Sequence, residues 1–356
     1  MAGGGTGGHV IPALAVAREL RQRGHRVFFV GTDRGMEAKL VPAEGFELRK
    51  IEIGGLNRVG MRQKLTTLAR LPFTTLGCSK FVRESCAVFS MGGYVAGPPV
   101  MAAMLRGVPV VVMEPNAVPG FTNRIIGRFV SRALVSFSET AKYFPNGKTE
   151  ITGLPVREEF FRIMPRPRGS VMNILITGGS QGSRRLNEAG RQSWPLFLKE
   201  SRKAGLAVRI LHQTGAAGFE SMREDFAKSG LPGEVVAFIG DMPAAFAEAD
   251  LVICRSGAGA VSELAAAGKP SILVPFPFAA DDHQTRNAEA LEHVDAARLV
   301  RDAEFTGEKL FAVVHALATD PGRLEGMGER ARQFARPGSA QRAAQILEEA
   351  AGISGR

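Results

Sequence analysis

Residues 3–9 read GGGTGGH and residues 178–183 read GGSQGS, and each glycine-rich run leads into a helix-like stretch. The second run follows the apolar segment NILIT at residues 173–177. A glycine loop that opens a helix leaves backbone N–H groups unpaired, and these groups together with the helix dipole favour a phosphate. One such loop is typical of one dinucleotide-binding unit. Two loops, about half a chain apart, predict an α/β protein with two Rossmann-like domains facing a cleft.

Short β-branched runs alternate with amphipathic stretches along the chain, which predicts doubly wound parallel sheets covered by helices. At 356 residues the chain is long enough for two domains. Residues 158–170 contain Pro165, Pro167 and Gly169 and form the expected linker. The expected domains are residues 1–160 and 161–338, with a last helix over 339–352 packing back on the first. The expected strands lie at 27–31, 48–53, 87–90, 108–113, 133–136, 173–177, 207–213, 235–238, 251–254, 271–275 and 297–300.

The first glycine loop has no obvious strand before it. In a doubly wound sheet the strand that precedes this loop is central, and Met1 and Ala2 are too few residues to supply one by sequence criteria. Either the natural start of the protein lies upstream of Met1, which we favour, or the sheet of the first domain is rebuilt at this point.

Composition excludes several classes of protein. The three cysteines, Cys78, Cys86 and Cys254, show neither a metal-binding spacing nor a disulfide framework, which favours a reducing, cytosolic setting. No signal peptide and no apolar run of spanning length is present in this sequence. Residues 1–160 hold 21 Lys and Arg against 12 Asp and Glu, whereas the rest holds 24 against 23. Aromatic residues are sparse and no nucleic-acid-binding module is recognisable, so the basic half favours a phospholipid surface or a diphosphate substrate over nucleic acid.

A turn of small residues follows the expected strand 251–254. After Arg255 comes SGAGAVSE, residues 256–263, which places the start of a helix near Ala258. Small residues let a diphosphate approach the N–H groups of the helix end, and Glu263 is placed to accept two hydrogen bonds from a ribose diol. The alternative is a tight turn whose glycines serve packing alone. Together with the loop at 178–182, nucleotide binding is the better interpretation.

Polar residues also follow the expected strand 271–275. Gln284 is a candidate partner for sugar hydroxyls, because ligands of α/β proteins bind at the carboxyl ends of strands. The neighbouring run Asp281-Asp282-His283 can suggest a metal. Adjacent acids at a helix start are more often caps, and their spacing matches no metal motif, so we expect no metal here.

The first glycine loop admits a competing interpretation. Gly3, Gly5 and Gly8 match the G-x-G-x-x-G pattern, and Asp33 follows the next expected strand, as in an NAD- or FAD-dependent oxidoreductase. That interpretation leaves the second glycine loop without a role. His9 directly follows the first loop, and the positive end of a helix favours the neutral imidazole that a general base needs. A capping or packing histidine is the alternative.

A basic, amphipathic stretch lies between Ile53 and Arg83, where there is no Asp or Glu. Such a stretch can lie in a membrane interface. The alternative is a pair of ordinary surface helices on either side of Pro72. The candidate membrane-facing residues are Arg62, Lys64, Leu68, Arg70, Phe73, Leu76, Lys80 and Phe81.

Five motifs occur in a fixed order: TGGHVIPA at 6–13, GGYV at 92–95, GGSQG at 178–182, RSGA with VSE at 255–263, and DHQ with NA at 282–288. They resemble the peptidoglycan glycosyltransferases that add N-acetylglucosamine to lipid I and form lipid II. The resemblance runs from about residue 2 to residue 350. It implies the GT-B architecture and an inverting transferase that needs neither a metal nor a cofactor.

The resemblance also implies partners and site residues. The donor is UDP-N-acetylglucosamine, bound mainly by the second domain. The acceptor is the undecaprenyl-diphosphate-linked muramoyl pentapeptide (lipid I), taken by the first domain at the cytoplasmic face of the inner membrane. The catalytic candidates are His9 and, in reserve, Glu114. The implied donor-binding residues are Thr6, Gly7, Gly8, Asn123, Arg157, Ser180, Ile239, Ala258, Gly259, Ala260, Val261, Ser262, Glu263, Gln284 and Asn287.

Other functions stay open on the sequence alone. A different GT-B glycolipid glycosyltransferase would share the motifs of the second domain. A UDP-sugar epimerase would act on the donor without an acceptor, and a non-catalytic UDP-sugar sensor would bind it without turnover.

Overall fold

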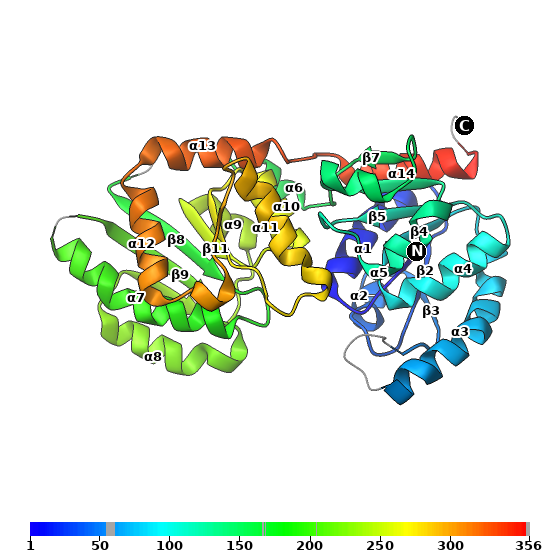
Figure 1. Cartoon of the computed structure of the whole chain (residues 1–356), viewed down its shortest axis with the longest axis horizontal. Coiled ribbons are helices and arrows are strands. Elements are labelled where there is room, and N and C mark those ends of the chain that lie inside the picture. The colour runs from blue at the N-terminus through cyan, green and yellow to red at the C-terminus, as the bar shows by residue number, and fades with distance from the viewer. Residues whose placement is uncertain (55–60, 166, 168, 204, 354–356) are drawn as a thin grey trace. The chain divides into compact units, whose positions relative to one another are not determined.

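The computed structural model describes residues 1–54, 61–165, 167, 169–203 and 205–353, with only the backbone described for 61–68 and for Pro321. Its chain divides into two compact units (Figure 1). Unit 1 comprises Met1–Pro155 and Gly338–Arg356, and unit 2 comprises Val156–Pro337. Each unit is a parallel sheet with helices, so the expected α/β class with two doubly wound sheets is confirmed.

Unit 1 contains a seven-stranded parallel sheet in the order β3-β2-β1-β4-β5-β6-β7. The order reverses between β1 and β4, and the first glycine loop starts at this point. Its helices are α1 (Gly7–Gln22), α2 (Glu37–Ala43), α3 (Met61–Val82), α4 (Gly97–Leu105), α5 (Phe121–Ile126) and α14 (Ser339–Ala351). Its strands are β1 (Ala2–Gly3), β2 (Phe28–Gly31), β3 (Glu47–Lys50), β4 (Val88–Gly92), β5 (Val110–Glu114), β6 (Arg132–Val135) and β7 (Thr149–Ile151).

The expectation that Met1 and Ala2 cannot supply the central strand is wrong. Ala2–Gly3 form β1, which pairs with β2 on one side and with β4 on the other. Two residues suffice because ladders on both sides hold them, and the Met1 carbonyl accepts a further bond from Val30 N at 2.9 Å. The expected break between two helices at Pro72 is also wrong, since α3 continues through Pro72.

Unit 2 contains a six-stranded parallel sheet in the order β10-β9-β8-β11-β12-β13, and the second glycine loop follows its central strand β8. Its strands are β8 (Val171–Thr177), β9 (Ala207–Gln213), β10 (Gly233–Val236), β11 (Leu251–Cys254), β12 (Ser271–Leu273) and β13 (Arg298–Leu299). Its helices are α6 (Glu158–Phe161), α7 (Arg184–Arg202), α8 (Phe219–Ser229), α9 (Met242–Glu248), α10 (Ala258–Ala267), α11 (His283–His293), α12 (Gly307–Ala318) and α13 (Pro321–Arg332).

The chain passes between the units at Pro155–Val156 and again at Pro337–Gly338. The first crossing precedes residues 158–170, where we expected the linker. The reason is that Phe160 is fully buried and packs edge-on against Phe246 of unit 2, with ring centroids 5.1 Å apart. After the second crossing, α14 packs against α1 in unit 1, and Ser339 Oγ donates to the Gly153 carbonyl at 2.9 Å.

Candidate active site

In unit 2, the loop of residues 178–183 joins β8 to α7. Ser183 caps α7, since its Oγ accepts from Leu186 N at 3.4 Å. Ser180 is exposed on this loop. Gly182 has a φ of 72°, and a Cβ there would overlap the Thr214 carbonyl. The glycine therefore lets the loop lie directly against the end of β9 and presents Ser180 at the carboxyl edge of the sheet.

Arg255, at the end of β11, ties this loop to the next turns of unit 2. Its guanidinium donates to Ser183 Oγ at 2.8 Å and to Asp302 Oδ1 at 2.6 Å. It also donates to the carbonyls of Val274 and Pro275, both at 3.0 Å. These four acceptors hold the guanidinium rigidly, and the Asp302 carboxylate balances its charge.

Gln213, the last residue of β9, bridges two loops. Its Nε2 donates to the Gly179 carbonyl at 2.7 Å, and its Oε1 accepts from Ile239 N at 2.9 Å. The backbone N–H of Ile239 is thereby used, so a base contact through Ile239 would fall to its carbonyl. Gln213 was not among the residues singled out from the sequence.

The turn from Ala258 to Glu263 forms the first part of α10, as expected. Glu263 is half-buried, and its carboxyl group has no hydrogen-bond partner among the described residues. Burial raises the pKa of Glu263 to about 7, and the nearby positive charge of Arg157 opposes that rise. The structure thus brings together two of the expected donor-binding residues, and it leaves the carboxyl oxygens of one of them available.

Gln284 and Asn287, one turn apart on α11, have different surroundings. Gln284 Oε1 accepts from Phe276 N at 2.9 Å, which leaves its Nε2 as the donor for a ligand. Asn287 is fully buried, and its Nδ2 donates to the Ser256 carbonyl at 3.1 Å. Ser256 Oγ in turn donates to the Gln284 carbonyl at 2.8 Å. Asn287 therefore supports the turn before α10, and its expected contact with the sugar stays a prediction.

In unit 1, the first glycine loop encloses the carboxylate of Glu37, the first residue of α2. Glu37 Oε2 accepts from Gly5 N at 2.7 Å, and Oε1 accepts from Thr32 N at 3.0 Å and Thr32 Oγ1 at 2.8 Å. Burial alone would raise the pKa of Glu37, but hydrogen bonds from Gly5, Thr32 and its own backbone together hold that pKa below its ordinary value. The loop therefore already holds an anion.

This arrangement argues against a dinucleotide cofactor on the first loop. Asp33, the acid expected to bind a ribose in that case, is 67% exposed and lies 3.7 Å from Arg34 Nε. The N–H of Gly5, which a pyrophosphate would need, is bonded to a buried carboxylate. The oxidoreductase interpretation thus loses both of its sequence supports.

His9 lies in the first turn of α1 and is half-buried. Its Nδ1 is 3.2 Å from the Gly4 carbonyl and 3.5 Å from Thr6 Oγ1. A carbonyl only accepts, so the neutral ring carries its proton on Nδ1 and Nε2 is the basic nitrogen. Thr6 and Gly8 are exposed and Gly7 is half-buried, so the loop beside His9 is open to a ligand.

Glu114, the reserve candidate for a base, is committed to its own loop. It is 2% exposed and accepts from Asn116 N and Nδ2 and from Gly120 N, each at 3.0 Å, and from Asn123 Nδ2 at 2.8 Å. Burial raises the pKa of Glu114, and the four donors oppose that rise. The buried Asn123 keeps one acceptor, Oδ1, without a hydrogen-bond partner among the described residues. Of the two candidates for the base, His9 has the more exposed side chain, and its role stays a prediction.

Helix α3 carries an apolar and basic surface. Phe73 is 75% exposed and Leu76 is 68% exposed, and the exposed Arg70 and Lys80 flank them at helical spacing. Phe81 is half-buried, with its ring centroid 5.2 Å from the Arg49 guanidinium carbon. The side chains of Arg62, Lys64 and Leu68 lie outside the described residues. None of the described helices combines the length and apolar content needed to cross a bilayer.

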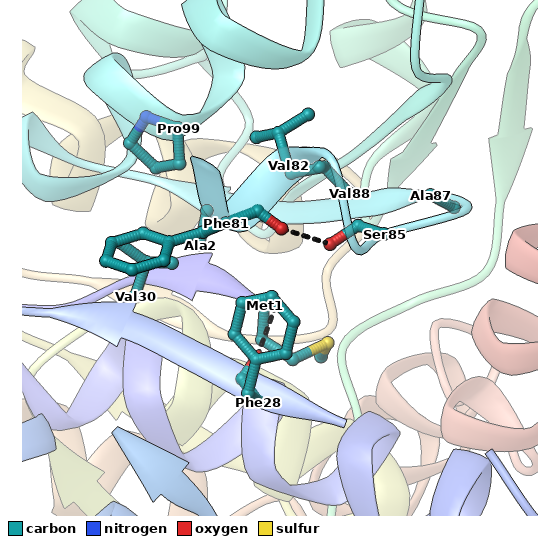
Figure 2. A pocket seen from close by; sticks show the side chains of 10 residues that line it. All are labelled: Met1, Ala2, Phe28, Val30, Phe81, Val82, Ser85, Ala87, Val88 and Pro99. Atoms are coloured by element: carbon teal, nitrogen blue, oxygen red, sulfur yellow. Dashed lines mark hydrogen bonds between the residues drawn. The ribbon is translucent and has the colours of Figure 1, made fainter. Parts of the chain in front are cut away.

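A cavity of about 20 Å³ in unit 1 lies between the sheet and helices α3 and α4, and Phe81 is the one candidate site residue in its lining (Figure 2). It has room for about one water molecule. The only side-chain hydrogen bond drawn at its wall runs from Ser85 Oγ to the Phe81 carbonyl. The cavity is lined by Met1, Ala2, Phe28, Val30, Phe81, Val82, Ser85, Ala87, Val88 and Pro99. This volume is too small for a sugar or a nucleotide.

Both halves of the chain match models of one protein family. Residues 1–135 match the glycosyltransferase family 28 N-terminal domain, and residues 173–344 match the glycosyltransferase family 28 C-terminal domain. A relative from Solibacter usitatus is 73% identical over 99% of this chain and 95% of its own length. It is named UDP-N-acetylglucosamine--N-acetylmuramyl-(pentapeptide) pyrophosphoryl-undecaprenol N-acetylglucosamine transferase.

Solved structures are also similar to this chain. The crystal structure of MurG from Acinetobacter baumannii has a TM-score of 0.81 and 35% identity, and the match covers 98% of each chain. A UDP-GlcNAc 2-epimerase from Neisseria meningitidis, solved with UDP-GlcNAc bound, has a TM-score of 0.63 and 13% identity, covering 97% of each chain. At that identity the likeness shows the fold alone.

Proposed function

The chain belongs to glycosyltransferase family 28, and from this premise we propose that it transfers N-acetylglucosamine from UDP-N-acetylglucosamine to lipid I, forming lipid II. The observation that carries the proposal is the 73% identity, over nearly the whole chain, to a transferase named for this reaction. The open carboxyl of Glu263 and the basic nitrogen of His9 agree with it. The direct test is transfer of labelled sugar to lipid I.

Unit 2 would hold the donor. The N-termini of α7 and α10, with Ser180 on the first and residues 258–262 on the second, offer N–H groups to the diphosphate. Glu263 accepts from the ribose hydroxyls, Ile239 contacts the uracil, and Gln284 donates to the sugar. Arg157 adds a positive charge beside Glu263.

The reaction is a single displacement. The C4 hydroxyl oxygen of the muramyl sugar forms a bond to the anomeric carbon while the bond from that carbon to the diphosphate oxygen breaks, and UDP leaves with the electron pair. The hydroxyl proton passes to His9 Nε2. Attack opposite to the leaving group inverts the anomeric configuration. Thr6, Gly7, Gly8 and Asn123 of unit 1 would position the reacting sugars.

Negative charge develops on the leaving diphosphate and must be stabilised. We assign this stabilisation to the N-termini of α7 and α10. Among the described residues there is no group of three or more His, Cys, Asp or Glu side chains placed to hold a metal ion. In the Asp281-Asp282-His283 run, Asp282 Oδ1 accepts from Thr285 Oγ1 at 2.6 Å, and His283 Nδ1 donates to the Ala280 carbonyl at 2.6 Å.

Turnover is therefore expected to persist in excess EDTA. The measurement is the initial rate of sugar transfer with and without chelator, at the same ionic strength. A loss of activity that Mg²⁺ or Mn²⁺ restores would contradict the assignment and bring the carboxylates of Asp281 and Asp282 back as ligands.

We further propose that α3 places the protein on an anionic membrane surface, where its lipid-linked acceptor is found. Phe73 and Leu76 would enter the interface, and Arg70 and Lys80 would meet lipid phosphates. The excess of basic residues in the first 160 residues adds long-range attraction. Arg62, Lys64 and Leu68, on the same helix, belong to the same proposal.

Replacing both Phe73 and Leu76 by Ser is expected to weaken binding to anionic vesicles at least about tenfold, because a buried Phe or Leu contributes about 1.5–3 kcal/mol each. This loss should be the same at low and high salt. Charge reversal at Arg70 and Lys80 should instead weaken binding mainly at low salt, at about 1 kcal/mol per charge. Co-sedimentation measures both.

Met164→Ser is the matched control, because Met164 is equally exposed but lies in unit 2. All variants should keep the wild-type affinity for UDP. If the double Ser variant binds vesicles as well as wild type does, α3 is an ordinary solvated helix and the proposed membrane contact is wrong.

A further inference from the structure

Glu37 is a fully buried acid that the proposed reaction does not use. It lies at the start of α2, after β2, and its carboxylate reaches back to the first glycine loop. A buried carboxylate is costly unless it is well bonded. Glu37 meets this condition through its hydrogen bonds to Gly5 and Thr32, and the bond to Gly5 connects it to the loop that precedes His9. We therefore ask what this carboxylate does for His9.

Three glycines surround the side chain of Glu37, and a side chain at any of them would collide with it. A Cβ on Gly4 would lie 2.5 Å from Glu37 Oε1, and a Cβ on Gly31 would lie 2.6 Å from Glu37 Cγ. A Cβ on Gly35 would overlap Oε2. Three glycines from two separate segments thus form one cradle. Within the first loop, the buried carboxylate thus accounts for the glycine at position 4 and for the hydrogen bond of Gly5 N–H.

Glu37 and His9 contact the same peptide group. The N–H of Gly5, which donates to Glu37 Oε2 at 2.7 Å, and the carbonyl of Gly4, which is 3.2 Å from His9 Nδ1, belong to the Gly4–Gly5 peptide. In a trans peptide these two groups point in opposite directions, and the chain has no cis peptide among its described residues. The carboxylate and the imidazole therefore lie on opposite edges of one planar amide.

The carboxylate of Glu37, the Gly4–Gly5 peptide and the imidazole of His9 are linked by consecutive hydrogen bonds, and consecutive hydrogen bonds polarise one another. An anion that accepts from the N–H pushes electron density toward the carbonyl oxygen, which then becomes a stronger acceptor for the proton on His9 Nδ1. A carboxylate that contacts a histidine directly fixes its tautomer and stabilises the imidazolium in the same way. Here one peptide group stands between the two side chains.

We propose that Glu37 is a positioning residue for His9, which acts through the Gly4–Gly5 peptide to fix the Nδ1–H tautomer and to stabilise the charge that forms when Nε2 takes the acceptor proton. This inference rests on the proposed role of His9 as the base. Gly93 packs close to the same ring, since a Cβ there would lie 3.3 Å from His9 Cε1 and Nδ1.

The main test is a double-mutant cycle on kcat with Glu37→Gln, His9→Ala and the double variant. Glu37→Gln alone is expected to lower kcat roughly 10- to 100-fold, by analogy with partners that orient a metal-ligating histidine, with the KM for UDP-N-acetylglucosamine unchanged. In the His9→Ala background the same change should have little further effect, because the group it acts on is gone. Equal effects in both backgrounds would overturn the inference.

Glu44→Gln is the matched control. Glu44 directly follows α2 and accepts two hydrogen bonds from Arg18, and no hydrogen bond joins its side chain to the first loop among the described residues. Its replacement by Gln removes the same charge as Glu37→Gln does. Its kcat should stay at the wild-type value. If Glu44→Gln and Glu37→Gln lower kcat alike, the effect is general destabilisation of unit 1 and not a relay.

If Glu37→Gln does not fold, the inference is tested by measuring the tautomer of His9 in the wild-type protein by NMR. With ¹⁵N-labelled histidine, the six ring systems are resolved and His9 is assigned by its absence in His9→Ala. At a pH where the ring is neutral, His9 should carry its proton on Nδ1, and the Gly5 amide proton should resonate at low field. A proton on Nε2 would overturn the inference. Near-normal kcat in His9→Ala would instead overturn the proposed base while leaving the tautomer readable.

Discussion

Replacing His9 by Ala is expected to lower kcat by about 10²- to 10⁴-fold, the usual contribution of a positioned general base. The affinity for UDP should change little, because His9 is proposed to act on the proton of the acceptor hydroxyl, whereas the proposed UDP ligands belong to unit 2. The physical reason is that the attacking hydroxyl must lose its proton as the new bond forms. Single-turnover rates with lipid I, together with UDP titrations, measure the two effects separately.

A Glu114→Gln variant serves as the comparison. Glu114 is buried under four hydrogen-bond donors and is expected to affect folding of its loop more than the chemical step. If His9→Ala keeps a normal kcat and only raises KM, while a folded Glu114→Gln loses turnover, the base has been assigned to the wrong residue.

Glu263→Ala is expected to weaken UDP-N-acetylglucosamine binding about 10²-fold or more, because each charge-assisted hydrogen bond to a ribose hydroxyl contributes about 1.5–3 kcal/mol. A 2′,3′-dideoxy analogue should bind wild type and variant alike. If the variant keeps the wild-type preference for the ribose diol, Glu263 is not its ligand.

The same residue predicts a pH dependence. In the free protein the pKa of Glu263 is raised by burial to about 7, and only the ionised carboxylate accepts from both hydroxyls. Donor affinity should therefore be full above pH 7 and fall as the pH is lowered through that value, because a proton must then be displaced on binding. Calorimetric Kd values for UDP-N-acetylglucosamine between pH 5.5 and 8.5 measure this. In Glu263→Gln the dependence should vanish; its persistence there would assign it to another group.

The strand β11 was predictable because a strand buried at every position reads as an apolar run, and the predicted residues 251–254 coincide with it. The predicted residues 207–213 coincide with β9, although Arg209 within it is exposed. Ala2–Gly3 gave no such signal, since two residues form a strand only when neighbours pair with them on both sides. The strand Thr149–Ile151 was missed for a related reason, as it is short and lies at the sheet edge.

The parts of the candidate site that are formed by a local backbone motif were predictable from the sequence. The parts that depend on a side chain from a distant segment of the chain were not. Glycine loops and the turn before Glu263 are local patterns. Glu37 was overlooked in favour of Asp33, because both are acids after β2 and only the fold shows which one turns inward. Gln213 and Asp302 support the unit 2 loops from other segments, and no local spacing links them to Gly179 or Arg255.

The most direct test of the proposed function is incubation of the protein with UDP-N-acetylglucosamine labelled in the sugar, with and without lipid I, followed by extraction into butanol. We expect label in the lipid fraction only when lipid I is present, one UDP released per sugar transferred, and a β linkage to the muramyl C4 oxygen. Label that never enters the lipid, or conversion of the donor to another UDP-sugar without acceptor, would contradict the assignment and favour an epimerase on the same fold.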